Sequence, residues 1–372
     1  MDPKISNIST LDETLLFTLS GVDVSIANSI RRIIISDIPS FVIKTLPHSE
    51  NLVNFTINTS RFNNEIIKQR LSCIPIHIND MEFPYDDYII EVDVTNNTKD
   101  NIYVTTKDFQ IKNKITDKFE PQAIVLKMFP PDKISGDFIE LVRLRPKISS
   151  SSDGERIKFT AGITIATAKE NSSFNVASTV CFSNTKDLIK INEVWSQKEK
   201  ILKQEKEPDI EYLKKDWDLL EAKRIFIPNS FDFKIETIGV LSNINILFYA
   251  CKIMIRKIEN FIESLQKDIS LIKASIVTIP NSFDIILNNE DYTLGKVIEF
   301  ILFTKHFNNE NPHSDKTVTF CGFKKDHPHS LFSIIRIAFT VAKTPSEVLT
   351  TIINDSNELI SLYSKLSSNF AD

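Results

Sequence analysis

The chain has 372 residues, of which 42% are hydrophobic, and a formal net charge of -5 at pH 7. That length and composition are typical of a globular protein with two or three domains and enough apolar material for a core. The acidic balance argues against a protein whose main activity is electrostatic binding of nucleic acid. Only 7 glycines are present. The phosphate-binding loop motifs G-x-x-x-x-G-K-S/T and G-x-G-x-x-G do not occur, so nucleotide binding by such loops is not expected.

The four cysteines, Cys73, Cys181, Cys251 and Cys321, are far apart and form no C-x-x-C pair. A disulfide framework or a cysteine-rich zinc site needs clustered cysteines, so buried and reduced thiols are the simplest interpretation. The N-terminus lacks a basic and apolar signal sequence, and no stretch approaches the ~20 apolar residues of a membrane span. We therefore expect a reducing, intracellular compartment and no membrane contact.

A strand-like segment over residues 11–20 leads into the first predicted helix, over 24–36. Asp23 is placed to cap this helix. Its apolar positions follow helical spacing and predict one buried face: Ile26, Ile30, Ile33 and Ile34. Arg31 and Arg32 lie away from much of that face, and a solvated surface is the ordinary interpretation of two such charges.

Short alternating runs broken by Asn, Asp and Pro replace the helical pattern from about residue 42 to 150. Four of these runs predict strands: 55–57, 88–94, 102–104 and 123–128. Residues 64–76 predict one or two helical turns that run into a proline. Strand-like alternation returns at 156–167 and 231–237, so the pattern indicates a β-rich insertion within another sheet.

The segment from 186 to 224 is heavily charged, with Trp195 and Trp217 as its only large anchors, and predicts a helical or loose excursion. The longest amphipathic pattern follows, over 244–265. Its apolar positions alternate spacings of four and three, as in a coiled-coil seam: Leu247, Cys251, Met254, Ile258, Phe261 and Leu265. We expect a second segment of the chain to pack along this seam helix.

The residues after Pro280 predict a small α+β unit. Its elements are a strand over 283–287, a helix capped by Asp291, strands over 318–323 and 331–340, and a last helix. The last helix has a nearly complete start signal, because Thr344 can cap it, Pro345 occupies its first position and Glu347 completes a capping box.

A short phrase occurs twice, near opposite ends of the chain. Residues 25–33 (SIANSIRRI) and 293–301 (TLGKVIEFI) both place a hydroxyl, an aliphatic, a tiny and a polar residue ahead of the same apolar spacing. Two halves that share a pattern can pack through equivalent surfaces, as a symmetric dimer does. The repeat therefore predicts that this chain forms its own dimer.

Residues 22–32 (VDVSIANSIRR) resemble the signature helix of the assembly subunits of multisubunit DNA-dependent RNA polymerases, namely the bacterial alpha subunit and the third-largest subunit of eukaryotic polymerase II. Residues 58–75 are similar to the next signature of that family, an Asp-Glu pair followed by His-Arg-Leu-Gly-Leu-Ile-Pro. Here Asn64, Gln69 and Ser72 replace the aspartate, the histidine and the glycine.

The end of the chain resembles the small eleventh subunit, which pairs with the third-largest. Residues 290–295 (EDYTLG) match its Glu-Asp-His-Thr-Leu-Gly phrase with Tyr292 for histidine, and 321–323 with 327–328 match its Gly-Tyr and His-Pro turn. A fusion of these two subunits is similar to the arrangement in polymerases of large cytoplasmic DNA viruses.

The resemblance implies an α+β fold in which two alpha-subunit-like dimerisation modules are fused as an intramolecular pseudo-heterodimer with a β-rich insertion domain. The implied parts are residues 1–45 with 152–268 (third-largest-like), 46–151 (insertion) and 275–372 (eleventh-like). The implied pseudo-dimer interface comprises Ile26, Asn28, Ile30, Leu247, Met254, Ile258, Phe261, Leu294, Gly295, Ile298 and Ile352. The implied docking residues for the large subunits are Arg31, Arg32, Glu65, Arg70 and Pro75.

The function implied is a non-catalytic assembly platform of a DNA-directed RNA polymerase, which nucleates binding of the largest and second-largest subunits and contacts small assembly subunits. DNA and RNA would be reached only indirectly, through the complex. No cofactor is expected. Family members often carry a cysteine-rich zinc site in the insertion, but this chain has no cysteine between Cys73 and Cys181, so we expect no zinc. For a viral protein, the host cytoplasm (viral factory) and the virion are the expected locations.

Two groups of residues offer alternative, metal-binding interpretations. Asp216 and Asp218 could bind magnesium, but a solvated helix is favoured because no other acidic motif is near. His313, His327 and His329 are close in sequence but lack H-E-x-x-H spacing, which favours turns. The alternative function is a stand-alone transcription regulator or assembly chaperone that uses the same dimer module.

Overall fold

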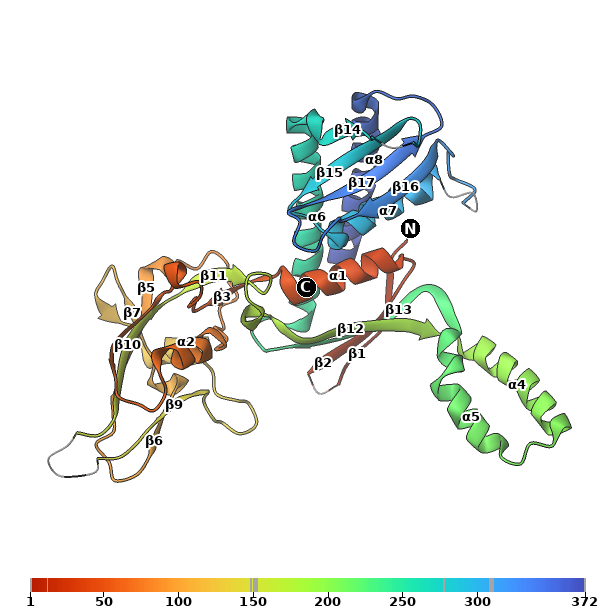
Figure 1. Ribbon diagram of the computed structural model, residues 1–372. Coiled ribbons are helices and arrows are strands. Elements are labelled where there is room, and N and C mark those ends of the chain that lie inside the picture. Colours follow the sequence, from red (N-terminus) through yellow and green to blue (C-terminus); the bar gives the residue numbers. More distant parts are fainter. Residues whose placement is uncertain are drawn as a thin grey trace. The chain divides into compact units, whose positions relative to one another are not determined.

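The computed structural model describes residues 2–11, 13–147, 149, 153–276, 278–307 and 311–370 (Figure 1). These described residues form two compact units. Unit 1 comprises Met1–Ile34, Thr179–Glu236 and Asn243–Asp372, and unit 2 comprises Ile35–Ser178 and Thr237–Ser242. The three-part division expected from the sequence stays a prediction, and its boundary at residues 151 and 152 lies outside the described residues.

Unit 1 begins with a sheet in the order β1-β2-β13-β12. Its strands are β1 (Lys4–Leu11), β2 (Thr14–Ser20), β12 (Ala177–Lys186) and β13 (Phe226–Thr237). Gly21, at φ +76°, turns the chain out of β2, and a Cβ there would lie 2.2 Å from the carbonyl oxygen of Asp2. Helix α1 (Val24–Ser36) follows, and the amide of Ser25 donates to Asp23 Oδ1 at 2.8 Å. The predicted cap and the predicted first helix are thus confirmed.

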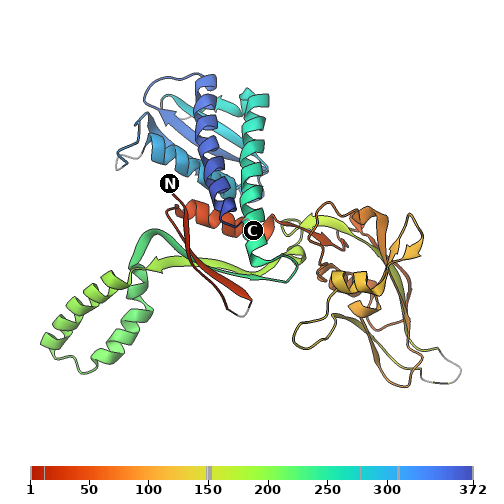
Figure 2. The ribbon, with the colours of Figure 1, turned by 180° about the vertical axis from the view of Figure 1, so that it is seen from behind.

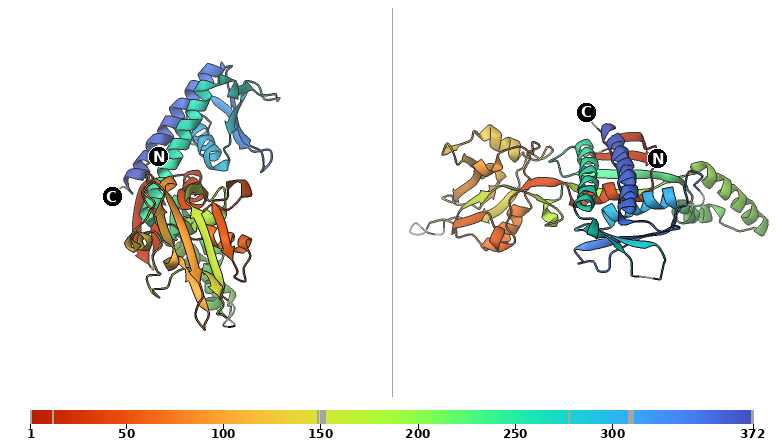
Figure 3. Two further views of the ribbon diagram at one scale, coloured as in Figure 1. Left: turned by 90° about the vertical axis from the view of Figure 1, so that its left-hand side faces the viewer. Right: turned by 90° about the horizontal axis from the view of Figure 1, so that it is seen from above.

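The C-terminal part of unit 1 is a second sheet with three helices. The strand order is β14-β15-β17-β16. The strands are β14 (Ile272–Ala274), β15 (Ser282–Asn288), β16 (Val318–Lys324) and β17 (Phe332–Phe339), and the helices are α6 (Asn243–Lys267), α7 (Tyr292–His306) and α8 (Pro345–Ser368). Helices α6 and α8 lie side by side (Figures 2 and 3), so α8 is the expected segment along the seam helix.

The charged segment of unit 1 is a helical hairpin, α4 (Leu188–Glu205) and α5 (Ile210–Leu219), followed by the 3-10 turn η5 (Glu221–Arg224) (Figure 1). The rings of Trp195 and Trp217 lie 5.3 Å apart. Together with Ile191 and Ala222 they form a small hydrophobic cluster of their own. Of the two alternatives predicted for this segment, helical or loose, the structure has the helical one, with the two tryptophans at its core.

Unit 2 is built mainly from strands. One sheet has the order β4-β10-β5-β7-β8, and two pairs, β3 with β11 and β6 with β9, accompany it. The strands are β3 (Pro39–Val42), β4 (Val53–Asn58), β5 (Tyr88–Thr95), β6 (Ile102–Thr105), β7 (Gln110–Asn113), β8 (Lys118–Phe119), β9 (Glu140–Leu144), β10 (Arg156–Gly162) and β11 (Thr164–Thr167). A continuous apolar cluster fills this unit, with Phe109 and Phe159 fully buried at its centre.

Two helices belong to unit 2, α2 (Asn64–Ser72) and α3 (Gln122–Met128). The first confirms the predicted helical turns, capped by the side chain of Asn63. The second corrects a prediction, because residues 123–128 were expected to form a strand. Val125 and Met128, three positions apart, are buried, whereas Ile124 and Leu126 are exposed. A short apolar run is compatible with either a strand or a buried turn of helix. Burial of residues three positions apart is the spacing of a helix.

The expectation that all four cysteines are buried is also corrected. Cys251 is buried, but Cys73 and Cys181 are exposed, so burial was wrong for two of the four. Burial raises the pKa of Cys251 to about 12, which keeps that thiol protonated. Within the described ranges, no helix combines the length and the apolar content that crossing a bilayer requires.

Candidate functional site

Helix α1, from the start of the chain, and helix α8, from its end, are joined by a buried pair of hydroxyl groups in unit 1. Ser29 Oγ lies 2.6 Å from the hydroxyl oxygen of Tyr363. Ser29 also donates to the carbonyl oxygen of Ile26 at 2.7 Å, so it is left to accept from Tyr363. Tyr363 is fully buried, and burial raises its pKa, which keeps the phenol protonated as a donor.

A second connection runs from α1 to the start of α7. Arg32 Nη2 donates to Asp291 Oδ2 at 2.7 Å, and Arg32 Nε donates to Thr293 Oγ1 at 2.8 Å. Asp291 is also the N-cap of α7, since its Oδ1 accepts from the amide of Thr293. One carboxylate therefore caps α7 and anchors an arginine 259 positions away in the chain.

A third connection joins α6 to the same end of α7. Lys257 Nζ lies 3.2 Å from Glu290 Oε1, and both side chains are more than four-fifths buried. The backbone carbonyl of Glu290 accepts from Ser333 Oγ of β17 at 3.0 Å. The segment just before α7 is thus held by α6 and by the sheet as well as by α1.

The predicted interface residues meet in unit 1. Nine of them are at most 5% exposed: Ile26, Ile30, Leu247, Met254, Ile258, Phe261, Leu294, Ile298 and Ile352. Gly295 is needed for close packing, because a Cβ there would lie 2.0 Å from a ring carbon of Phe323. Asn28 is half-buried and accepts from Arg31 Nε at 3.0 Å. The apolar positions on which the sequence interpretation rested are therefore core positions.

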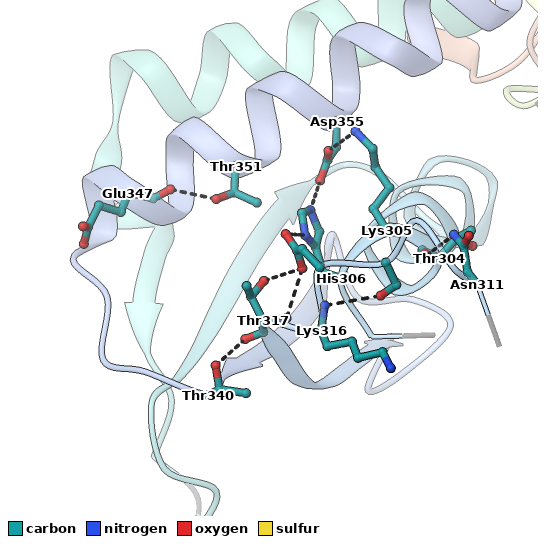
Figure 4. Close-up of polar contacts among 12 residues, drawn as sticks. Thr304, Lys305, His306, Asn311, Lys316, Thr317, Thr340, Glu347, Thr351 and Asp355 are labelled. Atoms are coloured by element: carbon teal, nitrogen blue, oxygen red, sulfur yellow. Dashed lines mark hydrogen bonds and ion pairs between the residues drawn. The ribbon is translucent and has the colours of Figure 1, made fainter. Parts of the chain in front are cut away.

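A polar cluster between α7 and α8 was not found from the sequence (Figure 4). Asp355, a buried residue of α8, accepts from Lys305 Nζ and contacts His306 Nε2, each at 2.8 Å. His306 Nδ1 lies 2.7 Å from Asp315 Oδ2. Burial alone would lower the pKa of His306, but its bonds to the two carboxylates outweigh burial and raise it. The helical spacing showed only the apolar face of α8, so no signal pointed to Asp355.

The docking residues expected from the resemblance fall in both units. Arg31 and Arg32 belong to unit 1, where both make the intrachain bonds described above. Glu65, Arg70 and Pro75 belong to unit 2.

Each of the three docking residues of unit 2 has a distinct environment. Glu65 is exposed in the first turn of α2. Arg70 Nη2 donates to the carbonyl oxygen of Glu140 at 2.6 Å, and its guanidinium lies 5.7 Å from the centre of the Phe62 ring. Pro75 is half-buried and lines a cleft of about 170 Å³.

In the described part of the chain, no group of three or more His, Cys, Asp or Glu side chains is arranged to hold a metal ion. The amide of His329 donates to His327 Nδ1 at 3.1 Å, and the amide of Ser330 donates to the His327 carbonyl at 2.9 Å, as in a turn. The expectation that the protein binds no zinc stays a prediction.

The sequence matches the RNA polymerase Rpb3/Rpb11 dimerisation domain over residues 16–258. The chain belongs to this family. The matched range includes α1 and most of α6, two of the helices that carry the connections described above.

Individual relatives are subunits of RNA polymerases. DNA-directed RNA polymerase subunit Rpo3 of Pyrococcus furiosus is 26% identical over 288 residues, which cover 71% of this chain and 97% of that protein. Subunit 3 of the DNA-directed RNA polymerases II, IV and V of Arabidopsis thaliana is 28% identical over 219 residues, 51% of this chain and 59% of that protein. The probable DNA-directed RNA polymerase II subunit RPB11 of Caenorhabditis briggsae is 34% identical over 77 residues, 21% of this chain and 55% of that protein. The chain is therefore a homologue of polymerase subunits.

Proposed function

We propose that this chain is a non-catalytic assembly platform of a multisubunit DNA-directed RNA polymerase, in which a third-largest-like module and an eleventh-like module are fused as an intramolecular pseudo-heterodimer. The observation that carries the proposal is the junction in unit 1, where Arg32 binds Asp291 and Ser29 binds Tyr363. Similarity to both Rpo3 and RPB11 relatives supports a role as a polymerase subunit of this family. In the proposed division, 1–45 with 152–268 form the first module, 46–151 the insertion and 275–372 the second.

Fusion would favour assembly through effective concentration. A linker that spans comfortably converts pairing of the two modules into an intramolecular step, with an effective concentration of about millimolar. The linker here is the short segment from the end of α6 through β14 to β15, which stays within unit 1. The platform would therefore be formed before any large subunit arrives.

The proposed partners are the largest and second-largest polymerase subunits and small assembly subunits, with DNA and RNA contacted through the complex. Exposed Glu65 and Arg70 of unit 2 offer groups for such docking, and a planar guanidinium can pair bidentately with a carboxylate. We propose no cofactor and no zinc. A fused arrangement is similar to that of large cytoplasmic DNA viruses, so we extend the proposal to a viral source, a site of action in the host cytoplasm and packaging in the virion.

The first experiment is purification of the tagged chain from its native source, with mass spectrometry of stoichiometric companions and an assay of template-dependent RNA synthesis. Equimolar recovery with two very large polymerase chains, together with activity, is expected. Recovery alone or with unrelated partners would instead favour a stand-alone transcription regulator or assembly chaperone.

A second experiment tests the fusion itself. A protease site inserted between β14 and β15 leaves α6 on one fragment and α7 and α8 on the other. Because α6 and α8 pack along their length, we expect the two fragments to stay together on gel filtration after cleavage. Separation into two soluble fragments would contradict a shared core.

A third experiment asks whether Arg32 docks a large subunit directly. Arg32→Ala is expected to leave the chain folded and to prevent capture of the second-largest subunit. Asp291→Asn is the matched control, because it weakens the intrachain bond to Arg32 but keeps both the arginine and an N-cap residue. Loss of capture in Arg32→Ala alone would indicate direct docking, whereas equal loss in both would indicate that Arg32 acts through α7. Unchanged capture in both would contradict the proposed interface.

A further inference from the structure

A groove of about 690 Å³ lies in unit 1 between the first turn of α1 and the outer side of α7. Aromatic side chains form much of its wall: Tyr292, Phe300 and Phe303 of α7 and Phe182 of β12. Asp23 and Ser25, at the start of α1, form its polar end. Tyr292 and Phe303 remain 48% and 37% exposed, so apolar surface faces the opening.

The start of α1, which borders this groove, corresponds to the start of α7, which binds Arg32. In the repeated phrase, Asp23 corresponds to Asp291 and Ser25 corresponds to Thr293. The two helix starts have the same local geometry, because each aspartate Oδ1 accepts from the amide two residues later at 2.8 Å. The two starts differ in what faces them from the other helix.

Arg32 faces the start of α7 and donates to both Asp291 and Thr293. The residue that corresponds to Arg32 in the second phrase is Phe300, and it faces the start of α1 in the groove. Phenylalanine has no donor to offer. One helix start is therefore filled by a guanidinium from within the chain, and the other opens on a cavity.

The polar groups of the groove reflect that difference. Ser25 Oγ is buried and, among the described residues, has no hydrogen-bond partner. The carboxylate of Asp23 forms no ion pair with any residue that the structure describes. The lysine that lines the groove, Lys296, is paired with Glu299, which also lines it, because the lysine Nζ lies 2.5 Å from Glu299 Oε2. A buried hydroxyl without a partner is costly, and the Asp23 carboxylate, whose Oδ1 accepts from the Ser25 amide, lacks a cationic partner.

We propose that this groove binds an arginine side chain presented by an apolar segment of a partner protein. Its guanidinium donates to the carboxylate of Asp23, as Arg32 does to Asp291, and the hydroxyl of Ser25, once its side chain turns toward the groove, is the second acceptor that Thr293 is for Arg32. A planar group with several donors suits this acceptor pair better than an ammonium, and aromatic rings stabilise a bound cation while apolar neighbours pack on them. The inference rests on the two-module organisation proposed above and adds the chemistry of a partner.

The test uses the full chain and two fluorescein-labelled peptides. The first is Gly-Leu-Leu-Arg-Leu-Ser, and the second carries citrulline, which has nearly the same shape but no charge, in place of arginine. Fluorescence anisotropy is expected to show at least about tenfold tighter binding of the arginine peptide. Equal affinity for the two peptides, or a Kd above about 1 mM for the arginine peptide, would overturn the proposal.

Two variants locate the binding. Asp23→Asn keeps a residue that caps helices well but removes the charge, so the preference for arginine over citrulline should disappear. Phe300→Arg should fill the groove from within and abolish binding of the arginine peptide, with circular dichroism to confirm folding. Asp326→Asn removes a carboxylate that is 58% exposed outside the groove and should change nothing. An arginine preference that survives Asp23→Asn would refute the assignment.

The outcome separates this inference from the proposed function. Peptide preference without recovery of polymerase subunits would leave the groove assignment intact and remove the polymerase role. Recovery of polymerase subunits without peptide preference would do the reverse.

Discussion

The hydroxyl pair between α1 and α8 allows a sharp prediction, because its two partners are not equivalent. Ser29 has a second hydrogen bond, to the carbonyl of Ile26, whereas the hydroxyl of Tyr363 bonds to Ser29 alone among the residues that the structure describes. Tyr363→Phe therefore leaves no polar group stranded, and Ser29→Ala leaves a buried phenol hydroxyl without a partner. The order of the two destabilisations follows from this asymmetry alone.

The magnitudes follow from the cost of each loss. Tyr363→Phe removes one net hydrogen bond and should lower the free energy of unfolding by about 1 kcal/mol. Ser29→Ala strands a buried donor and should cost about 1–3 kcal/mol. The double variant removes both partners together, so no donor is stranded, and its cost should fall short of the sum of the single costs by about 1 kcal/mol.

Urea unfolding followed by far-UV circular dichroism measures these costs. Hydrogen exchange in α8 is a useful second readout, because the two compact units need not unfold in one step. Ser368→Ala is the matched control, since Ser368 makes the same bond to a carbonyl three residues earlier but is exposed. A larger cost for Tyr363→Phe than for Ser29→Ala, or strictly additive costs, would refute the reasoning.

Three further predictions concern packing and charge. Gly295→Ala should destabilise unit 1 by about 1–3 kcal/mol in urea unfolding, because its Cβ would overlap the Phe323 ring, and Phe323→Leu in the same chain should restore part of the loss. His306, whose folded pKa is raised, should contribute stability that is present below its ordinary pKa of 6.5 and lost as pH rises through the folded value. The difference in unfolding free energy between the wild type and His306→Gln should therefore shrink as the pH rises above about 6.5 and through the folded pKa, and a difference that stays constant would contradict this. Trp217→Ala should melt only the α4–α5 hairpin, because its hydrophobic cluster is separate, so exchange should accelerate there and stay unchanged in α6.

Much of the fold could be predicted from local signals in the sequence. The capping residues Asp23, Asp291 and Thr344 each mark a helix start that the structure contains. The apolar residues from Leu247 onwards, spaced alternately by four and three positions, mark the buried face of α6. These signals are reliable because capping and one-sided burial depend on residues close in sequence. The prediction for residues 123–128 failed because a run of five apolar residues and one lysine is compatible with a short strand and with a short helix.

The contacts of the site could not be predicted in this way. Arg32 and Asp291 were both singled out, one as an exposed charge and the other as a cap, but nothing local connects residues 259 positions apart. Arg32 was assigned to an outside partner only by resemblance, and its bond to Asp291 was missed. Asp355 was missed because a carboxylate on the predominantly apolar side of a helix carries no pattern of its own.

The repeated phrase did contain a clue to the asymmetry of the junction, since Arg32 aligns with Phe300 while the capping aspartates are shared. In a dimer of identical chains, every substitution appears on both sides of the axis, so a residue that closes one contact closes both. The two modules proposed for this chain would be free of that constraint. A single replacement can close one helix start with an internal arginine and leave the other open. The proposed fusion, which would make pairing intramolecular, would therefore also permit the two sides of the proposed platform to present different chemistry, and different chemistry is what distinct partners require.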